Sequence, residues 1–402
     1  MTDRKSCLET AVDLGVSDRV SRVERSASLA IGDLAATLER EGADVIDLSL
    51  GDPDFETPQP IVAAAKRALD AGHTHYTQAA GIPTLREAIA TTLQVDGLEY
   101  RPEDIIVTPG GKQALFETIQ TLVDDGDEVI LLDPAWVSYE PMVKLTGGSL
   151  TRIDLAPYEF RLEPALDELG AAMSDETRLL IVNSPNNPSG AVYTEAALQG
   201  VRDLVVDHDV LAIADELYDA LTYEVEAPNL GALDGMSGRT VTINGFSKAY
   251  AMTGWRLGYL AAPASLVTQV TKIHSHSVTC APTFVQHAGV EALANADAAV
   301  REMRERFRQR RDLLMDLLGD LGVDVPTPDG AFYLMLPVDE NDVQWCETAV
   351  EEAHVAMVPG SAFGMPGYAR ISYVVEKPRL RTAIERLQDE GLLQPAINMR
   401  SE

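Results

Sequence analysis

The chain has 402 residues, of which 63 are acidic and 32 are lysine or arginine, giving a formal net charge of −31. A surface with this much negative charge repels nucleic acid and anionic membranes, so neither is an expected partner. Because 46% of the residues are apolar and the acidic residues are spread along the chain, we expect two folded domains adapted to a salt-rich cytoplasm.

Short apolar runs, typical of buried strands, alternate with amphipathic segments, typical of helices, through the middle of the chain. The sequence predicts strands at 44–51, 104–109, 128–133, 178–183, 210–216 and 239–245, and helices at 85–94, 112–123 and 195–208. This alternation predicts a large α/β domain with a mostly parallel sheet over residues 50–305. A charged helix at about 295–319 leads to a smaller α+β domain, predicted to combine residues 306–402 with an N-terminal arm, 1–49.

Polar and glycine-rich segments follow several of these strands, where ligands of such sheets bind. Gly110 and Gly111 in "PGGKQ" open a helix and expose backbone N–H groups to an anion. "NSPNNPSG" follows strand 178–183, and "DELY" places Asp215 and Tyr218 at the end of strand 210–216. Each feature alone also suits a tight turn or a helix cap, but the combination indicates a site.

A lysine and an arginine lie eight positions apart in "FSKAYAMTGWRLGY", which is otherwise small, aromatic or aliphatic. The chain contains only seven lysines, so Lys248 among such neighbours is not ordinary surface composition. Lys248 and Arg256 are therefore candidates for chemistry rather than for a solvated pair.

The cysteines Cys7, Cys280 and Cys346 are widely separated and lack CxxC spacing or a nearby histidine pair. Neither a disulfide framework nor a metal site is expected from that pattern. No basic segment precedes an apolar stretch at the start, and no run of about 18 apolar residues occurs, so the expected location is the cytoplasm.

Eight motifs occur in an order that resembles the class I pyridoxal-phosphate-dependent aminotransferases of fold type I, and most closely the aspartate aminotransferase group. They are "YTQAAGIPTLREAI", "TPGGKQAL", "DPAWVSYEPMV", "SPNNPSG", "DELY", "FSKAYAMTGWRLGY", "DGAFYL" and "ARISY". The resemblance runs from about Ser26 to the final predicted helix. It implies pyridoxal 5′-phosphate as cofactor and ping-pong transfer of an amino group between an amino acid and a 2-oxo acid.

The resemblance implies three catalytic residues. Lys248 matches the lysine that holds the cofactor aldehyde as a Schiff base and then moves the α-proton. Asp215 matches the carboxylate that keeps the pyridine nitrogen protonated, and Tyr218 a hydroxyl that donates to the phenolic oxygen O3′.

The resemblance also implies the contacts that hold the cofactor. Besides the catalytic residues, they are Tyr76, Gly110, Gly111, Lys112, Trp136, Asn187, Ser247 and Arg256. Arg256, Ser247 and the glycines would bind the phosphate, Trp136 would stack on the ring, and Asn187 would donate to O3′. Tyr76 matches a tyrosine that reaches the phosphate of the neighbouring subunit, which implies a homodimer with shared active sites.

For the substrate, the resemblance implies a carboxylate site at Gly51 and Arg370, with Arg370 as a bidentate clamp beside Trp136 and Asn187. One subgroup binds the distal carboxylate with an arginine after the lysine motif, but this chain has no Lys or Arg between Lys272 and Arg301. Another subgroup uses a lysine that matches Lys112, with N-terminal hydroxyl residues where Ser26 and Ser28 stand. We therefore expect aspartate or glutamate as donor and 2-oxoglutarate as acceptor.

Several alternatives remain open. Aromatic amino acids, alanine and prephenate are further substrates, and a lyase of the same fold would keep Lys248, Asp215 and Arg256 without needing an oxo acid acceptor. A non-catalytic regulator would need a DNA-binding module, whereas only about 25 residues precede the resemblance. His274 and His276 fall near the expected pocket and are interpreted as polar residues of its rim.

Overall fold

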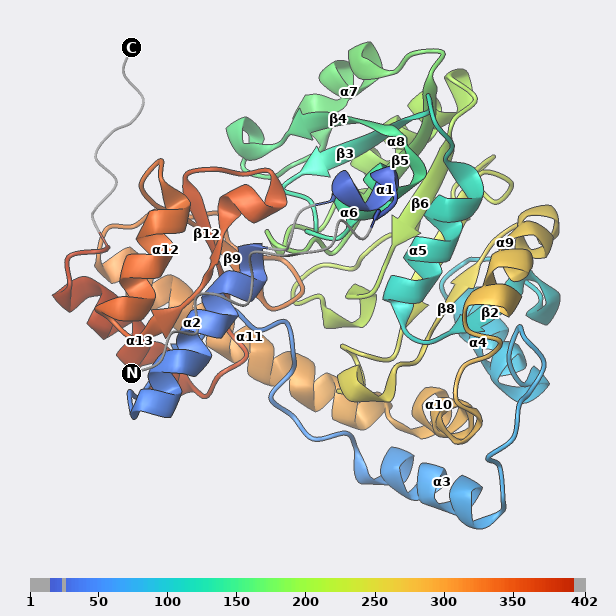
Figure 1. The fold of residues 1–402 in the computed structure, drawn as a ribbon, viewed down its shortest axis with the longest axis horizontal. Helices are drawn as coiled ribbons and strands as arrows, with labels where there is room; N and C mark the ends of the chain where they lie inside the picture. The colour runs from blue at the N-terminus through green and yellow to red at the C-terminus, as the bar shows by residue number, and fades with distance from the viewer. Residues whose placement is uncertain (1–14, 24–26, 394–402) are drawn as a thin grey trace.

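A seven-stranded sheet with the order β2-β8-β7-β6-β5-β3-β4 forms the centre of the larger of two units (Figure 1). The computed structural model describes residues 15–23 and 27–393. The strands of the sheet are β2 (Ile105–Thr108), β3 (Glu128–Asp133), β4 (Ser149–Asp154), β5 (Thr177–Asn183), β6 (Leu211–Asp215), β7 (Thr240–Gly245) and β8 (Gly258–Ala261). β3 to β7 pair in parallel, and β8 is antiparallel to both of its neighbours, β2 and β7. The predicted mostly parallel sheet is confirmed.

Alternate side chains of the central strands face two layers of helices. Val129 and Leu131 pack among α5, α6 and α9, whereas Ile130 and Leu132 pack among α7 and α8. A strand buried on both faces needs a continuous apolar run, which is why "EVILLD" is recognisable in the sequence. The helices of this unit are α3 (Gln59–Asp70), α4 (Pro83–Val95), α5 (Gly111–Leu122), α6 (Tyr139–Thr146), α7 (Leu166–Ala172), α8 (Glu195–Asp207), α9 (Ala264–Ser277) and α10 (Thr283–Asn295).

The smaller unit combines segments from both ends of the described chain. Its strands are β1 (Ile46–Asp47), β9 (Tyr333–Pro337), β10 (Val355–Ala356), β11 (Val358–Pro359) and β12 (Tyr368–Ser372). β11, β12 and β9 form an antiparallel sheet, and β1 pairs in parallel with β10. The helices are α2 (Ala27–Glu41), α11 (Asp297–Asp320), α12 (Asp342–Glu351) and α13 (Lys377–Asp389), and a short α1 (Asp18–Ser21) precedes them.

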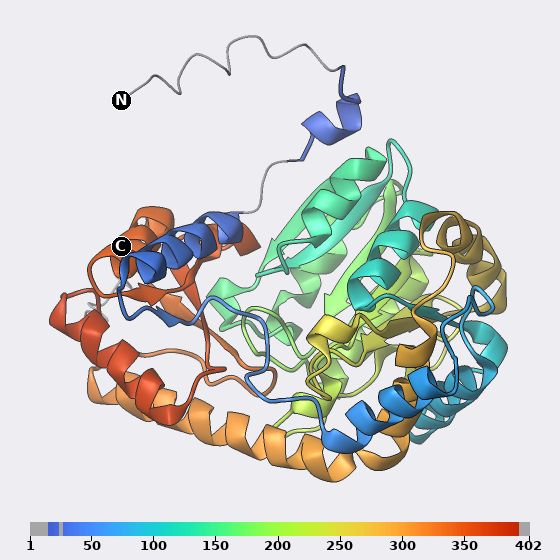
Figure 2. The same cartoon turned by 60° about the horizontal axis from the view of Figure 1, so that its bottom comes forward.

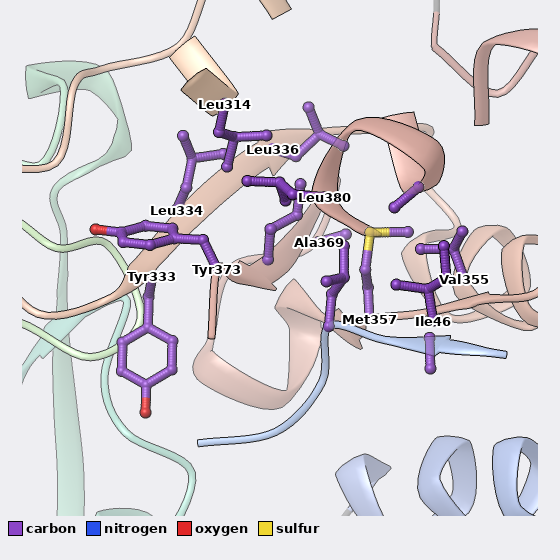
Figure 3. Packing of buried hydrophobic residues seen from close by; sticks show 14 of the residues in the cluster. Ile46, Leu314, Tyr333, Leu334, Leu336, Val355, Met357, Ala369, Tyr373 and Leu380 are labelled. Atoms are coloured by element: carbon purple, nitrogen blue, oxygen red, sulfur yellow. The ribbon is translucent and has the colours of Figure 1, made fainter. Parts of the chain in front are cut away.

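The core of the smaller unit brings residues from distant parts of the chain into contact. Figure 3 shows Ile46 beside Val355, and Leu314 near Leu334 and Leu336, in one buried cluster. The ring of Tyr333 extends from this core toward the larger unit, where its hydroxyl group contacts that of Tyr218. The strand β9 therefore carries a polar group from the small core to the boundary between the two units.

The long helix α11 runs from α10 along the edge of the molecule to the smaller unit (Figure 2). On it, the buried Arg310 donates two hydrogen bonds of 2.7 Å to the carboxylate of Asp54, and its guanidinium lies near the rings of Phe55 and Phe307. A bidentate pair of this kind restricts orientation as well as distance. The pair between Arg310 and Asp54 therefore holds the segment that follows Gly51 against α11.

Two differences from the sequence-based expectations have a clear cause. The strand predicted at 44–51 covers only Ile46–Asp47 and pairs in the smaller unit, because the Asp47 carboxylate then accepts from the N–H and hydroxyl of Ser49 and turns the chain. β4 and β8 were not predicted, since β4 is a partly exposed edge strand and β8 contains no β-branched residue, unlike the equally short β2. Among the described residues, no helix is long and apolar enough to cross a membrane.

Candidate active site

A cavity of about 770 Å³ lies beyond the carboxyl ends of the central strands and is closed on one side by the smaller unit. Most residues expected at a site line it, namely Gly51, Gly111, Lys112, Trp136, Asn187, Asp215, Tyr218, Ser247, Lys248, Arg256 and Arg370. Gly110 does not line the cavity but is adjacent to Arg256, and Tyr76 is 84% exposed on the outer surface. The fold thus brings together expected site residues that are up to 319 positions apart, from Gly51 to Arg370.

Lys248 follows β7 and extends into the cavity. Its amine donates a hydrogen bond to the backbone carbonyl of Gly51 and lies 5.9 Å from the centre of the Phe332 ring. Burial, together with the neighbouring cations Arg370, Arg256 and Lys112, lowers the pKa of Lys248 to about 8 against the opposing effect of Asp52. The fraction of this amine that is neutral and nucleophilic near neutral pH is therefore far larger than for an ordinary lysine.

Asp215 ends β6 and is 5% exposed. The hydroxyl group of Tyr139 donates to its Oδ2 atom at 2.6 Å, and the amide of Asn183 donates to its backbone oxygen at 2.9 Å. Burial raises the pKa of Asp215 to about 6, while the hydrogen bond from Tyr139 opposes that rise. A cation placed against this carboxylate would be strongly stabilised, because few water molecules compete for it.

A chain of polar contacts crosses the cavity wall from the smaller to the larger unit. Arg370 Nη1 donates to Asn187 Oδ1 at 3.1 Å, Asn187 Nδ2 donates to the Tyr218 hydroxyl at 3.4 Å, and that hydroxyl lies 2.9 Å from the hydroxyl of Tyr333. All four side chains are buried. The orientation of each donor is thereby set before any ligand enters.

The start of α5 and the side chain of Arg256 form a site suited to an anion. Gly110 has a φ of 84°, and a Cβ atom there would lie 2.7 Å from Arg256 Nη2. Gly258 allows a similarly close approach, since its Cβ atom would lie 2.4 Å from the backbone nitrogen of Gly111. Exposed N–H groups at a helix start, next to a guanidinium group, favour a phosphate.

Arg370 retains unused hydrogen-bonding capacity. Its Nη1 and Nη2 atoms donate to Asn187 and to the carbonyl of Ser49, whereas its buried Nε atom has no partner among the described residues. The guanidinium lies between the rings of Tyr333 and Phe363, at 4.6 and 5.0 Å from their centres. An unpartnered buried donor on a guanidinium group suits a carboxylate ligand.

These groups fit the cofactor that the motifs imply. The amine of Lys248 suits its aldehyde, the carboxylate of Asp215 its ring nitrogen, and the hydroxyl of Tyr218 its phenolic oxygen. The ring of Trp136 provides a flat wall, and the glycines beside Arg256 leave room for a phosphate. The unpartnered Nε atom of Arg370 remains for a substrate.

Three residues of the site were missed in the sequence, namely Tyr139, Asn183 and Tyr333. Each lies inside or next to a recognised motif, but nothing in its spacing indicates a partner 32 to 115 positions away. Ser26 and the side chain of Ser28 lie outside the described part of the chain.

The interpretation of the two histidines as rim residues is wrong for His274. His274 is fully buried, and its Nδ1 atom lies 2.8 Å from the buried carboxylate of Glu117 on α5. The helical period places Val267, Val270 and His274 on the inner face of α9, whereas His276 is exposed. Neither histidine lines the cavity.

Comparison with known proteins gives a consistent result. A family model described as aminotransferase class I and II matches residues 43–387. The aspartate/prephenate aminotransferase of Thermus thermophilus is 43% identical over 354 residues, which are 86% of this chain and 91% of that protein. The aromatic-amino-acid aminotransferase 2 of Thermococcus litoralis is 40% identical over 86% of this chain and 91% of that one.

The structural comparison agrees with the sequence comparison. The structure of an aspartate aminotransferase from Thermus thermophilus with maleate superposes with a TM-score of 0.90 at 42% identity, covering 93% of this chain and 99% of that one. An aspartate aminotransferase from Thermotoga maritima gives a TM-score of 0.89 at 39% identity, with the same coverage.

Proposed function

The chain belongs to the class I and II aminotransferase family of pyridoxal-phosphate enzymes, and on this premise we propose that it transfers amino groups between the dicarboxylic amino acids aspartate and glutamate and their 2-oxo acids, with 2-oxoglutarate as the acceptor for aspartate. The observation that carries this proposal is the position of the Lys248 amine, in one cavity with Asp215, Arg256 and Arg370. When bound, pyridoxal phosphate supplies an aldehyde that condenses with amines and a ring that withdraws electrons from the substrate α-carbon.

The remaining roles in the reaction belong to residues of the chain. Lys248 binds the cofactor aldehyde through its amine and, once released by the substrate, carries the proton from the α-carbon. Asp215 holds the ring nitrogen in its protonated form, and Tyr218 and Asn187 donate to the phenolic oxygen. Arg370 orients the α-carboxylate, while Trp136 and the smaller unit restrict the access of water.

The proposal includes a homodimer in the cytoplasm. Tyr76 does not line the cavity of its own chain and is 84% exposed. This position supports the expectation, taken from the motif that contains it, that Tyr76 contacts the phosphate in the partner subunit.

A panel of amino donors tested against 2-oxoglutarate distinguishes the candidate activities. Aspartate is expected to be the best donor to 2-oxoglutarate, and glutamate, whose reaction with 2-oxoglutarate gives no net change, is tested as donor to oxaloacetate. Phenylalanine and alanine belong in the panel as further donors and prephenate as an alternative acceptor, because relatives bear the names of aromatic and aspartate/prephenate aminotransferases. Product formation over many turnovers from an amino acid without any oxo acid acceptor would instead indicate a lyase, since a transaminase releases only one equivalent of oxo acid per site before it needs an acceptor.

Two cations of the cavity are expected to differ in what they recognise. Arg370→Ala should lower kcat/KM for all donors alike, because every amino acid carries an α-carboxylate. Lys112, whose amine lies 4.8 Å above the Trp136 ring, is free to meet a distal carboxylate. Because Lys112 is exposed, Lys112→Ala should lower kcat/KM for aspartate by about 1 kcal/mol, the upper end for an exposed charge pair, and should spare phenylalanine. Equal losses for aspartate and phenylalanine in Lys112→Ala would show that Lys112 serves the cofactor instead.

The lowered pKa of Lys248 predicts how cofactor binding depends on pH. Only a neutral amine attacks an aldehyde, so the rate of reconstitution of the apoprotein should rise as the pH approaches about 8 and then level off. A lysine with an ordinary pKa would give a rate that continues to rise to about 10.4. Stopped-flow absorbance between pH 6 and 10 measures this profile, and a rate still rising above pH 9 would contradict the predicted environment of Lys248.

A further inference from the structure

Tyr76 belongs to the loop between α3 and α4, at the end of the molecule away from the smaller unit (Figure 1). Its side chain is 84% exposed, and no described residue forms a hydrogen bond or ring contact with it. If this ring serves the partner subunit, its own subunit has to hold the backbone on both sides of it. The contacts of that backbone are therefore informative.

The start of α10 holds the loop on both sides of Tyr76. The hydroxyl group of Thr283 donates to the carbonyl of His75, and Gln286 Nε2 donates to the hydroxyl group of Thr77 at 3.3 Å. Gln286 Oε1 accepts from the backbone N–H of Ile82 at 2.7 Å. Tyr76 thus lies between two residues that α10 binds directly.

Gln286 is fully buried, and its amide bonds only to loop segments. Besides Thr77 and Ile82, it donates to the carbonyl of Ala281 at 2.8 Å. A buried amide is costly to desolvate and contributes little net stability, but it defines geometry when all its hydrogen bonds are made. An apolar side chain here would leave the N–H of Ile82 and the carbonyl of Ala281 without these partners.

The far end of the same loop has anchors of its own. The N–H of Val107 donates to the carbonyl of Ala80 at 3.0 Å, and Arg86 donates to the side chain of Gln78 at 3.1 Å. Gln78 and Ala80 are therefore tied to α4 and β2 without α10. The position of Tyr76, in contrast, depends on the contacts made by Gln286 and Thr283.

We propose that Gln286 is a positioning residue for Tyr76, and that it acts on the active site of the partner subunit rather than on its own. The inference rests on the proposed homodimer with shared sites. If the loop is already ordered before the cofactor binds, no conformational entropy of the loop is lost on binding, and the contact between Tyr76 and the cofactor phosphate is not weakened by that loss. The chain then contributes to its partner through a buried amide that touches no ligand.

The first test replaces the amide with a side chain of similar length. Gln286→Met keeps the volume and removes the hydrogen bonds, and it should weaken pyridoxal phosphate binding to the apoprotein about 10-fold. Tyr76→Phe should weaken binding to a similar degree, and the double variant should lose no more than Tyr76→Phe alone. Additive losses in the double variant would overturn the proposed link between the two residues.

The second test uses mixed dimers in which Lys248→Ala prevents one site from binding the cofactor covalently, so that the visible absorbance of the Lys248-bound cofactor reports the affinity of the other site only. When Gln286→Met and Lys248→Ala are on the same chain, the remaining site receives Tyr76 from the altered chain and should bind the cofactor weakly. When they are on different chains, the remaining site receives Tyr76 from a chain with an intact Gln286 and should bind normally. The two dimers contain identical substitutions, so a general effect on folding would be the same in both. Equal cofactor affinities would overturn the role in the partner's site.

A milder variant covers the case in which Gln286→Met fails to fold. Thr283→Val removes only the hydroxyl group that donates to His75. Hydrogen exchange of residues 73–77 in the apoprotein should be faster in this variant and unchanged in residues 78–82, and unchanged exchange in both segments would contradict the proposal. A wild-type chain that is monomeric or binds no pyridoxal phosphate would overturn the proposed function itself. The mixed dimers distinguish that outcome from one in which only the role proposed for Gln286 is wrong.

Discussion

Lys248→Ala is expected to lower turnover by at least about 10⁴-fold, since it removes a covalent nucleophile together with a general base whose loss alone costs about 10²–10⁴-fold. The cavity keeps Arg256, Asp215 and the start of α5, so the variant should still bind pyridoxal phosphate without a covalent bond. Borohydride treatment of the wild-type protein, followed by peptide mass analysis, should place the reduced cofactor on Lys248.

Lys144→Ala is a suitable control, because Lys144 pairs with Glu140 on the surface and does not line the cavity. It should retain normal turnover and normal labelling. A small amine added to Lys248→Ala should restore part of the activity, as it supplies the missing base. Labelling at another lysine, or turnover within about 10-fold of wild type in Lys248→Ala, would disprove the assignment.

Asp215→Ala is expected to slow proton removal from the substrate by about 10²–10³-fold or more, the cost of losing one electrostatic partner of a transition state. The carboxylate lies in a buried position with Tyr139 at 2.6 Å, and no other described acidic side chain near it lines that part of the cavity. Single-turnover absorbance with aspartate isolates this step, and cofactor affinity should fall less than the rate.

Asp219→Asn provides the matched control for this variant. Asp219 is four positions away, accepts a hydrogen bond from Asn244 at 2.6 Å and does not line the cavity. Its replacement should leave proton removal within a few-fold of wild type. If Asp215→Ala behaved in the same way, Asp215 would be only a residue that ends its strand and caps the following turn.

The sequence alone was sufficient for the central parallel strands of the larger unit, though not for β4 or β8. The runs that became β3, β5, β6 and β7 are buried on both faces, and such strands are continuous in apolar residues. The helices between them carry the period of 3.6 residues. The motifs gave the family and the cofactor, because they contain the lysine, the carboxylate and the glycines that this chemistry requires. Adaptation to high salt stays a prediction from the net charge, and a cytoplasmic location stays a prediction from the lack of a signal-like or long apolar segment in the sequence.

Only the tertiary structure decided which side chains of the site contact one another. Three contacts depend on how separate helices and strands pack. They are the hydrogen bond from Tyr139 to Asp215, the contact of Tyr333 in the smaller unit with Tyr218, and the buried pair of His274 and Glu117. In the sequence, Gln286 cannot be distinguished from an ordinary polar residue of a helix. The packing of α10 nevertheless buries its amide against the loop that carries Tyr76. Local sequence encodes the period of an element and the identity of its side chains. A hydrogen bond between two residues that are separated by 76 or by 209 positions forms only once the core has set the distance between their elements.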